Sequence, residues 1–323
     1  MKAIVNTAPD RLEWQDLPTP EPGPGQVRVR TVACGVCATD LAMVRGWERT
    51  AFPAIPGHEW SGVVEAAGAG VDPALVGQPC VAENVLDDGG EVGFEHPGGY
   101  ASRLITQADR LQVLPPDLPL DLAAVIEPLA VCVRGLRRLR LEDRRRALVF
   151  GDGPVGLLLV MLLVERGVAE ITLVGGRDHR LAVGRELGKV RTLHCERLGP
   201  DLAAGVAAAA GRDYAAVIEA SGSPAAAAAA IGLAAAGGKV LFIGDYADAC
   251  ACFRWNTLLH RELEIIGSNA SAGAWPEAVR LAGQRRLPLE RLVTQRLAAC
   301  RFSEAFDRVR RGEGVKTVLL WDV

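Results

Sequence analysis

The sequence predicts an α/β protein in which an all-β unit of the barrel type is joined to a doubly wound parallel sheet. A change of pattern along the chain predicts this architecture. Residues 1 to about 120 hold short β-rich runs cut by Pro and Gly, whereas residues 126 to 268 alternate strands with Ala- and Leu-rich helical stretches. The chain has 323 residues, 49% of them hydrophobic, which is enough to bury two cores.

The expected elements follow this division in chain order. In the first part, the β-rich runs occupy residues 2–5, 20–34, 62–68, 76–83 and 99–106. In the second part, we expect strands at residues 147–150, 171–174, 215–220, 238–244 and 263–267, with helical stretches between them. The end of the chain offers helices at residues 275–284 and 302–311 and a closing strand at residues 316–321.

Charge and apolar runs exclude several classes of function. Only 23% of the residues are charged and the net charge is −3, so no positive field attracts nucleic acid or anionic lipid. The apolar stretch Val155–Val164 is about half the length that a membrane-spanning helix needs, and we interpret it as a buried helix. Eight cysteines without a signal peptide favour a reducing cytoplasm. We therefore expect neither a nucleic-acid partner nor a membrane.

A glycine-rich loop between a strand and a helix indicates a dinucleotide site. Gly151 allows a tight turn, Gly153 lets the backbone approach a pyrophosphate, and Gly156 packs the helix against the strand. Pro154 and Val155 lie where the helix begins, and its N-terminal amides supply donors for the anion.

The end of the next strand bears on the choice of coenzyme. An acid at this position would bind the adenosine ribose of NAD, but here the strand ends in Gly175-Gly176-Arg177. The two glycines leave room for a 2′-phosphate, and Arg177 and Arg180 can pair with it. We predict that NADP is preferred. NAD is the alternative, with Asp178 reaching back to the ribose.

Three separated segments carry residues of the kind that bind a catalytic metal. Cys37 closes a Cys-x-x-Cys pair that begins at Cys34, His58 and Glu59 are adjacent, and Glu127 follows much later. Thiolate, imidazole and carboxylate ligands suit a zinc ion with an open position. Cys34 is better explained as a small buried side chain.

The motifs CGVCATD, PGHEWSGVV, GDGPVGLL, EASGS and KTVLLW, taken in this order, resemble the zinc-dependent medium-chain dehydrogenase/reductase superfamily, the alcohol and polyol dehydrogenases. The resemblance runs over essentially the whole chain. It implies a GroES-like β-barrel catalytic domain from residues 1–128 and 270–323, with a Rossmann domain, residues 129–269, inserted between them. It also implies a homodimer or homotetramer.

The resemblance assigns roles to individual residues. Cys37 and His58 match zinc ligands, Glu127 matches a further ligand position, and Glu59 matches a carboxylate that either binds zinc or lies behind a ligand. Which of the two glutamates is the third protein ligand stays open.

Two neighbours of the first ligand complete the implied catalytic set. Thr39 matches the hydroxyl that passes on the substrate proton, and Asp40 matches the acid that orients the histidine.

One departure from the superfamily concerns the metal content. Larger members carry a lobe with four cysteines that hold a structural zinc, but residues 80–100 here contain only Cys80. We therefore expect a single zinc, the catalytic one, in each chain.

The implied reaction is reversible hydride transfer between NADP(H) and a secondary alcohol or polyol, or the corresponding ketone or aldehyde, as the small-molecule substrate. Two alternatives remain at this point: a zinc-independent quinone or enoyl reductase of the same fold, and a non-catalytic NADP-binding protein.

Overall fold

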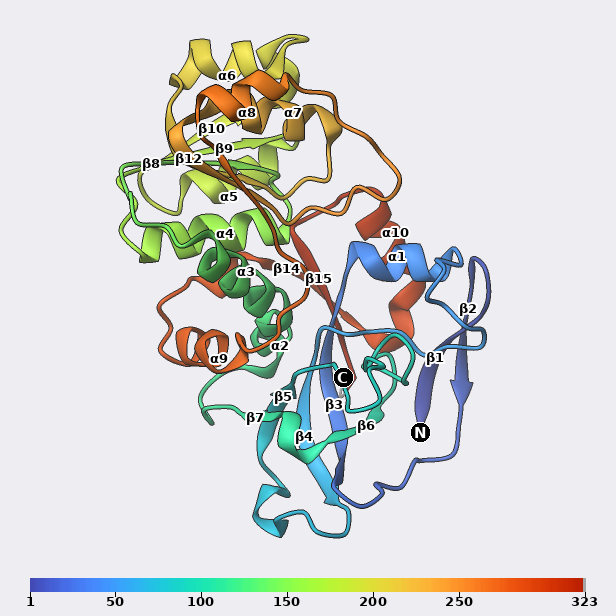
Figure 1. Cartoon of the computed structure of the whole chain (residues 1–323). Helices are drawn as coiled ribbons and strands as arrows, with labels where there is room; N and C mark the ends of the chain where they lie inside the picture. The colour runs from blue at the N-terminus through green and yellow to red at the C-terminus, as the bar shows by residue number, and fades with distance from the viewer. Residues whose placement is uncertain (322–323) are drawn as a thin grey trace. The chain divides into compact units, whose positions relative to one another are not determined.

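The computed structural model describes residues 1–321. The chain divides into two compact units, one formed by Met1–Glu127 with Trp275–Val323 and the other by Pro128–Ala274. Both ends of the chain therefore contribute to the first unit, and the second unit is an insertion between them (Figure 1).

The first unit is built on a seven-stranded sheet in the order β14-β15-β3-β4-β5-β7, with β6 paired to β3, and a two-stranded sheet of β1 and β2. The strands are β1 (Lys2–Ala8), β2 (Arg11–Asp16), β3 (Gln26–Val36), β4 (Trp60–Ala67), β5 (Pro79–Ala82), β6 (Arg103–Gln107), β7 (Leu111–Val113), β14 (Val293–Ala298) and β15 (Lys316–Leu320). Its helices are α1 (Ala38–Val44), α2 (Leu120–Ala123), α9 (Trp275–Gly283) and α10 (Phe302–Arg310).

Strand β3 explains how this sheet positions a site. Its first half alternates, with Val27 and Val29 buried and the arginines between them less so, because neighbouring side chains of a strand point to opposite faces. Its last four residues are all buried. Strand β15 runs antiparallel to β3, with Thr317 opposite Val36, so the start of β15 lies beside the end of β3 (Figure 1).

The second unit is a six-stranded sheet in the order β10-β9-β8-β11-β12-β13, and all its strand pairs are parallel. The strands are β8 (Arg146–Phe150), β9 (Glu170–Gly175), β10 (Val190–His194), β11 (Tyr214–Glu219), β12 (Ala234–Phe242) and β13 (Glu264–Gly267). The helices are α3 (Ile126–Leu139), which begins at the boundary between the units, α4 (Pro154–Glu165), α5 (Asp178–Arg185), α6 (Leu202–Ala210), α7 (Pro224–Leu233) and α8 (Trp255–His260).

This strand order reverses between β8 and β11, and ligands of open parallel sheets bind at the carboxyl ends of the strands at such a reversal. Helix α4 is apolar nearly all round and almost completely buried, as expected for Val155–Val164. No helix among residues 1–321 is both long and apolar enough to cross a membrane.

The sequence analysis missed four strands, β2, β7, β10 and β14. Strand β10 lies at the edge of its sheet, and only its first residue, Val190, is buried, so the apolar run that marks an inner strand is absent. In β14 the polar and charged residues Thr294 and Arg296 interrupt the apolar pattern. The fold class itself was predicted correctly.

Candidate active site

Cys37 lies in the turn between β3 and α1. Its backbone N–H donates to Asp40 Oδ2 at 2.8 Å, which holds the turn, and its sulfur lies 3.6 Å from the Thr39 hydroxyl oxygen. The thiol is therefore presented at the end of a buried strand, with a hydroxyl on the first turn of the following helix beside it.

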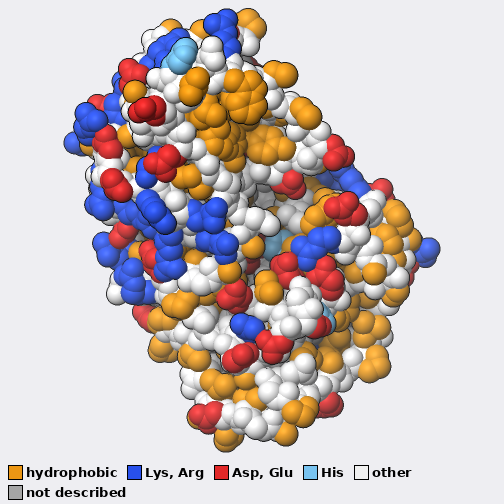
Figure 2. Space-filling view, in the orientation of Figure 1, with side chains coloured by type: hydrophobic (Ala, Val, Ile, Leu, Met, Phe, Trp, Pro, Cys, Tyr) orange, Lys and Arg blue, Asp and Glu red, His pale blue; other side chains and the backbone are white. Residues whose placement is uncertain are grey.

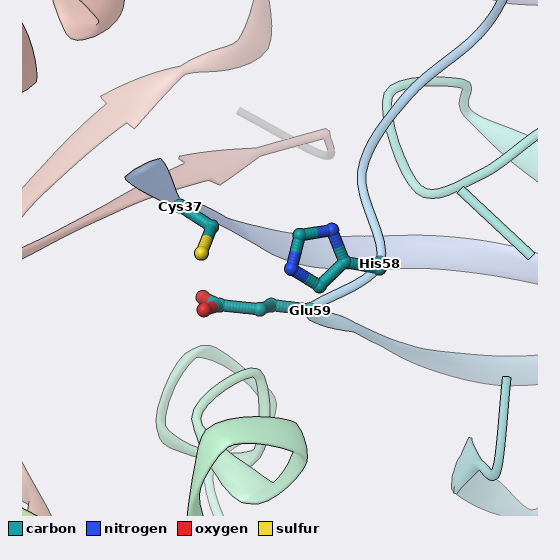
Figure 3. A group of neighbouring side chains, drawn as sticks. All are labelled: Cys37, His58 and Glu59. Atoms are coloured by element: carbon teal, nitrogen blue, oxygen red, sulfur yellow. The ribbon is translucent and has the colours of Figure 1, made fainter. Parts of the chain in front are cut away.

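His58 and Glu59 immediately precede β4 and meet Cys37. One ligand atom from each of these three side chains lies within 4.8 Å of the other two, and the side chains converge (Figure 3). The preceding Gly57 has a φ of +100°, and a Cβ there would come within 2.8 Å of Tyr100, so only glycine fits this turn. Sulfur, imidazole and carboxylate donors gathered in this way fit a zinc ion.

A buried carboxylate lies beside the ring of His58. Asp40 Oδ1 lies 3.3 Å from Nδ1 of His58, while Asp40 Oδ2 also accepts from the Tyr100 hydroxyl at 2.7 Å. Burial disfavours charge on both partners, but their mutual attraction raises the pKa of His58 well above its usual value and lowers the pKa of Asp40. Because Nδ1 faces Asp40, Nε2 is the nitrogen left for a metal.

Glu59 has a second buried partner, Lys316 at the start of β15. Both carboxylate oxygens of Glu59 accept from Lys316 Nζ at 2.7 Å, and the two side chains are 1% and 3% exposed. Burial alone would lower the pKa of Lys316, but Glu59 raises it. A Cβ at Gly35 would lie 2.2 Å from Glu59 Oε2, so this glycine makes room for the carboxylate.

Glu127 stands on the first turn of α3 and lies outside the close group of Cys37, His58 and Glu59. Burial raises the pKa of Glu127 to about 7; the charge of His58 opposes this shift and that of Glu59 adds to it. The structure thus places one of the two candidate glutamates within the group and the other outside it.

The short stretch between β5 and β6 supplies an aromatic side chain to the site. The ring of Phe94 lies 4.9 Å from that of His58, centroid to centroid. The Arg49 guanidinium lies over the rings of Phe94 and Trp47, at 4.7 and 5.5 Å, and its nitrogens donate to Glu91 and Glu95 at 2.9 Å. Salt bridges and cation–π contacts therefore hold this stretch in the described structure.

The second unit has a pocket of about 330 Å³ at the carboxyl ends of its strands. Of the predicted coenzyme residues, Gly151, Gly153, Gly175, Arg177 and Arg180 line it. Pro154, Val155 and Gly156 form the first turn of α4 instead.

The glycine loop has the geometry that a dinucleotide site requires. A Cβ at Gly156 would lie 1.8 Å from the carbonyl oxygen of Gly151, whereas a Cβ at Gly153 would meet nothing within 4 Å. Gly156 is therefore needed for close packing, and the backbone at Gly153 is open to a ligand.

One step of the sequence reasoning about this pocket was wrong. The space beside Gly175 is filled, because the carboxylate of Asp152 occupies it and accepts from the backbone N–H of Arg177 at 2.7 Å. Asp178 lies elsewhere, paired with Arg197 at 2.9 Å. The pocket thus contains a carboxylate together with Arg177 and Arg180.

Sequence reasoning missed Lys316, Tyr100 and Asp152. Lys316 left one usable signal, since a lysine inside the apolar run KTVLL must be paired if it is buried. Asp152 stands inside the glycine motif, at a position that the motif leaves open to any residue.

The chain matches two family descriptions, "Alcohol dehydrogenase GroES-like domain" over residues 23–116 and "Zinc-binding dehydrogenase" over residues 154–284. It is 31% identical to a D-altritol 5-dehydrogenase of Agrobacterium fabrum over 92% of each chain. The chain belongs to the zinc-dependent medium-chain dehydrogenase/reductase superfamily.

Other members of the superfamily match along nearly their full length. A D-arabitol-phosphate dehydrogenase of Enterococcus avium is 27% identical, covering 99% of this chain and 97% of its own. An Escherichia coli alcohol dehydrogenase solved with NADH has a TM-score of 0.92 at 22% identity, covering 99% of both chains, and shares the fold. As a superfamily member, the chain is an NAD(P)-dependent oxidoreductase of the alcohol and polyol dehydrogenase type.

Proposed function

We propose that this protein transfers a hydride reversibly between NADP(H) and a secondary alcohol carbon of a polyol, using one zinc ion per chain. The observation that carries the proposal is the convergence of Cys37, His58 and Glu59 beside the Thr39 hydroxyl. The relatives named as arabitol-phosphate, altritol and sorbitol dehydrogenases support a polyol as the substrate.

Charge balance supports Cys37, His58 and Glu127 as the protein ligands. The thiolate of Cys37 and the carboxylate of Glu127 together neutralise a divalent ion, and the Glu59–Lys316 pair is neutral by itself. Buried charge is tolerated when it is compensated in this way. Glu59, whose two oxygens both accept from Lys316, would then stand beside the ligands as a paired carboxylate and add negative potential.

Each neighbouring residue then has a defined task. Zinc supplies Lewis acidity that favours loss of the proton from an alcohol. Thr39 relays that proton, because its hydroxyl oxygen takes it up while its own hydrogen passes on to water or to the coenzyme ribose. Asp40 fixes the ring of His58 through Nδ1, and Tyr100 holds Asp40 in place.

Arg177 and Arg180 support the preference for NADP, because both line the coenzyme pocket and can pair with a 2′-phosphate. The open backbone at Gly153 and the N-terminus of α4 are suited to the pyrophosphate.

The second unit also supports association into a homodimer or homotetramer. Strand β13 ends its sheet, and three large apolar residues near it are exposed, Trp255 at 71%, Leu259 at 68% and Ile265 at 43%. Hydrophobic side chains gather over α8 (Figure 2). A second copy can pair with β13 about a two-fold axis. No disulfide joins the eight cysteines of residues 1–321, in keeping with a reducing compartment such as the cytoplasm.

The test is isotope transfer from a polyol panel. With polyols deuterated at the secondary carbon, we expect deuterium at C4 of the nicotinamide of NADPH, and loss of turnover in Cys37→Ala with NADPH binding retained. Turnover that survives this substitution would indicate a zinc-independent reductase. NADPH binding without turnover of any alcohol or carbonyl would indicate a non-catalytic protein.

A further inference from the structure

The coenzyme pocket contains one buried carboxylate that the superfamily pattern did not lead us to expect. Asp152 follows Gly151 in the glycine loop, is 5% exposed and lines the pocket. Its Oδ2 accepts from the backbone N–H of Arg177, the second residue after Gly175, which ends β9. The carboxylate is therefore fixed against the end of β9.

Gly175 is what admits this carboxylate. A Cβ at Gly175 would lie 2.4 Å from both Cβ and Oδ2 of Asp152, and 2.5 Å from its Cγ. The end of β9 is the position from which dinucleotide-binding sheets usually present an acid to the adenosine ribose. Here the strand supplies no side chain at Gly175, and the acid reaches the same place from the glycine loop.

Two arginines of the same pocket oppose this carboxylate. Arg177 and Arg180 both line the pocket beside Asp152. Burial and the charge of Arg177 lower the pKa of Arg180, while the charge of Asp152 opposes that shift, so the three charges influence one another. A 2′-phosphate would be attracted by the arginines and repelled by the carboxylate.

We propose that Asp152 is the residue that admits NAD to this site, by accepting a hydrogen bond from the adenosine ribose and opposing the 2′-phosphate that Arg177 and Arg180 attract. The choice of coenzyme then depends on one carboxylate and two guanidinium groups. NADP is preferred only if the attraction of Arg177 and Arg180 for the 2′-phosphate exceeds its repulsion by Asp152. This inference rests on the proposed function only in taking a nicotinamide dinucleotide as the ligand.

Asp178 is the competing acid, and the structure provides a reason to set it aside. It begins α5, is 61% exposed and pairs with Arg197 at 2.9 Å. Asp178→Asn is therefore a matched control, because it removes a carboxylate from the same region of the chain without changing the one that lines the pocket.

The experiment measures dissociation constants by titration calorimetry for NADH and NADPH, and for the fragments 5′-AMP and 2′,5′-ADP. The fragments report the adenosine end without any contribution from the metal. The proteins are the wild type, Asp152→Asn, Asp178→Asn and Arg177→Ala. Asparagine keeps the shape and one acceptor for the Arg177 N–H, and Asp152→Ser is a second variant should the first unfold.

Loss of the charged acceptor in Asp152→Asn should weaken NADH binding about tenfold. Removal of the repulsion should tighten NADPH binding roughly threefold to tenfold, and 2′,5′-ADP should follow NADPH. Asp178→Asn should leave the ratio of the two constants unchanged.

Equal weakening of both coenzymes in Asp152→Asn would overturn the inference, because Asp152 would then serve only to hold the turn at Arg177. The preference for NADP is tested separately by Arg177→Ala. If that variant leaves the ratio unchanged while Asp152→Asn shifts it, the arginine assignment fails and the role of Asp152 stands.

Discussion

The two units of this protein build their sites in opposite ways. In the first unit, the metal group is surrounded by buried charges that compensate one another, Asp40 with His58 and Glu59 with Lys316. In the second unit, four of the residues that line the coenzyme pocket are glycines, and Arg177, one of its two arginines, is exposed to solvent.

This contrast teaches where a substitution should alter stability and where it should alter specificity. A buried ion that loses its partner destabilises the fold, because the remaining charge has no water around it. Removal of an exposed arginine costs little folding stability and removes only the contact of that arginine with the ligand. The first unit should therefore respond to substitution mainly in stability and metal affinity, and the second mainly in ligand preference.

The largest effect is expected at Lys316. In metal-free protein, Lys316→Met leaves Glu59 as an unpaired buried carboxylate and should lower the free energy of unfolding by about 3–5 kcal/mol. Denaturant titration measures this. Lys239→Met is the control in the second unit: its nitrogen lies 3.6 Å from Glu264, which is 61% exposed, and its loss should cost under about 1 kcal/mol.

The double substitution Lys316→Met with Glu59→Gln should recover most of the lost stability, since no uncompensated charge remains. Wild-type stability in Lys316→Met alone would show that the pair contributes nothing, and the contrast between the units would fail.

A smaller effect is expected where a side chain supports the metal group through one of its ligands. Asp40→Asn weakens the hold on His58 and should lower zinc affinity by about 10- to 100-fold, measured by competition with a chromogenic chelator. Tyr100→Phe removes only the hydroxyl that donates to Asp40, so its effect should be smaller. Equal zinc affinity in wild type and Asp40→Asn would mean that the carboxylate does not orient the ring.

The smallest effect on stability is expected at Arg177. Its exposed side chain should contribute little to folding, so Arg177→Ala should unfold at the wild-type denaturant concentration. NADPH binding should nevertheless weaken about tenfold relative to NADH through loss of a charge-assisted contact. A clear loss of stability would show that Arg177 has a structural role. It would contradict the expectation that substitutions in the second unit change mainly ligand preference.

The same contrast explains what the sequence could predict. The glycine loop could be predicted because its function resides in a short run of neighbouring residues. Its glycines are needed for the backbone geometry, as at Gly151 and Gly156. The closing strand and the Cys37 and His58 motifs were equally local. The fold class followed from the alternation of strands and helices.

The side-chain partners of the site residues could not be predicted from the sequence, because these contacts join positions that are far apart in the chain. Lys316 reaches Glu59 across 257 residues and Tyr100 reaches Asp40 across 60, and no local pattern encodes either pairing. Asp152 was close in sequence, but its importance depends on the empty side-chain position at Gly175, which appears only when the strands are placed side by side.

The most direct test of the account is the zinc content per chain, by elemental analysis of protein purified without chelators or a metal-binding tag. We predict one zinc per chain in the wild type and none in Cys37→Ala, with NADPH binding unchanged. A wild type without zinc, or zinc that persists in Cys37→Ala, would contradict the site, and two zinc ions per chain would contradict the expectation of a single one.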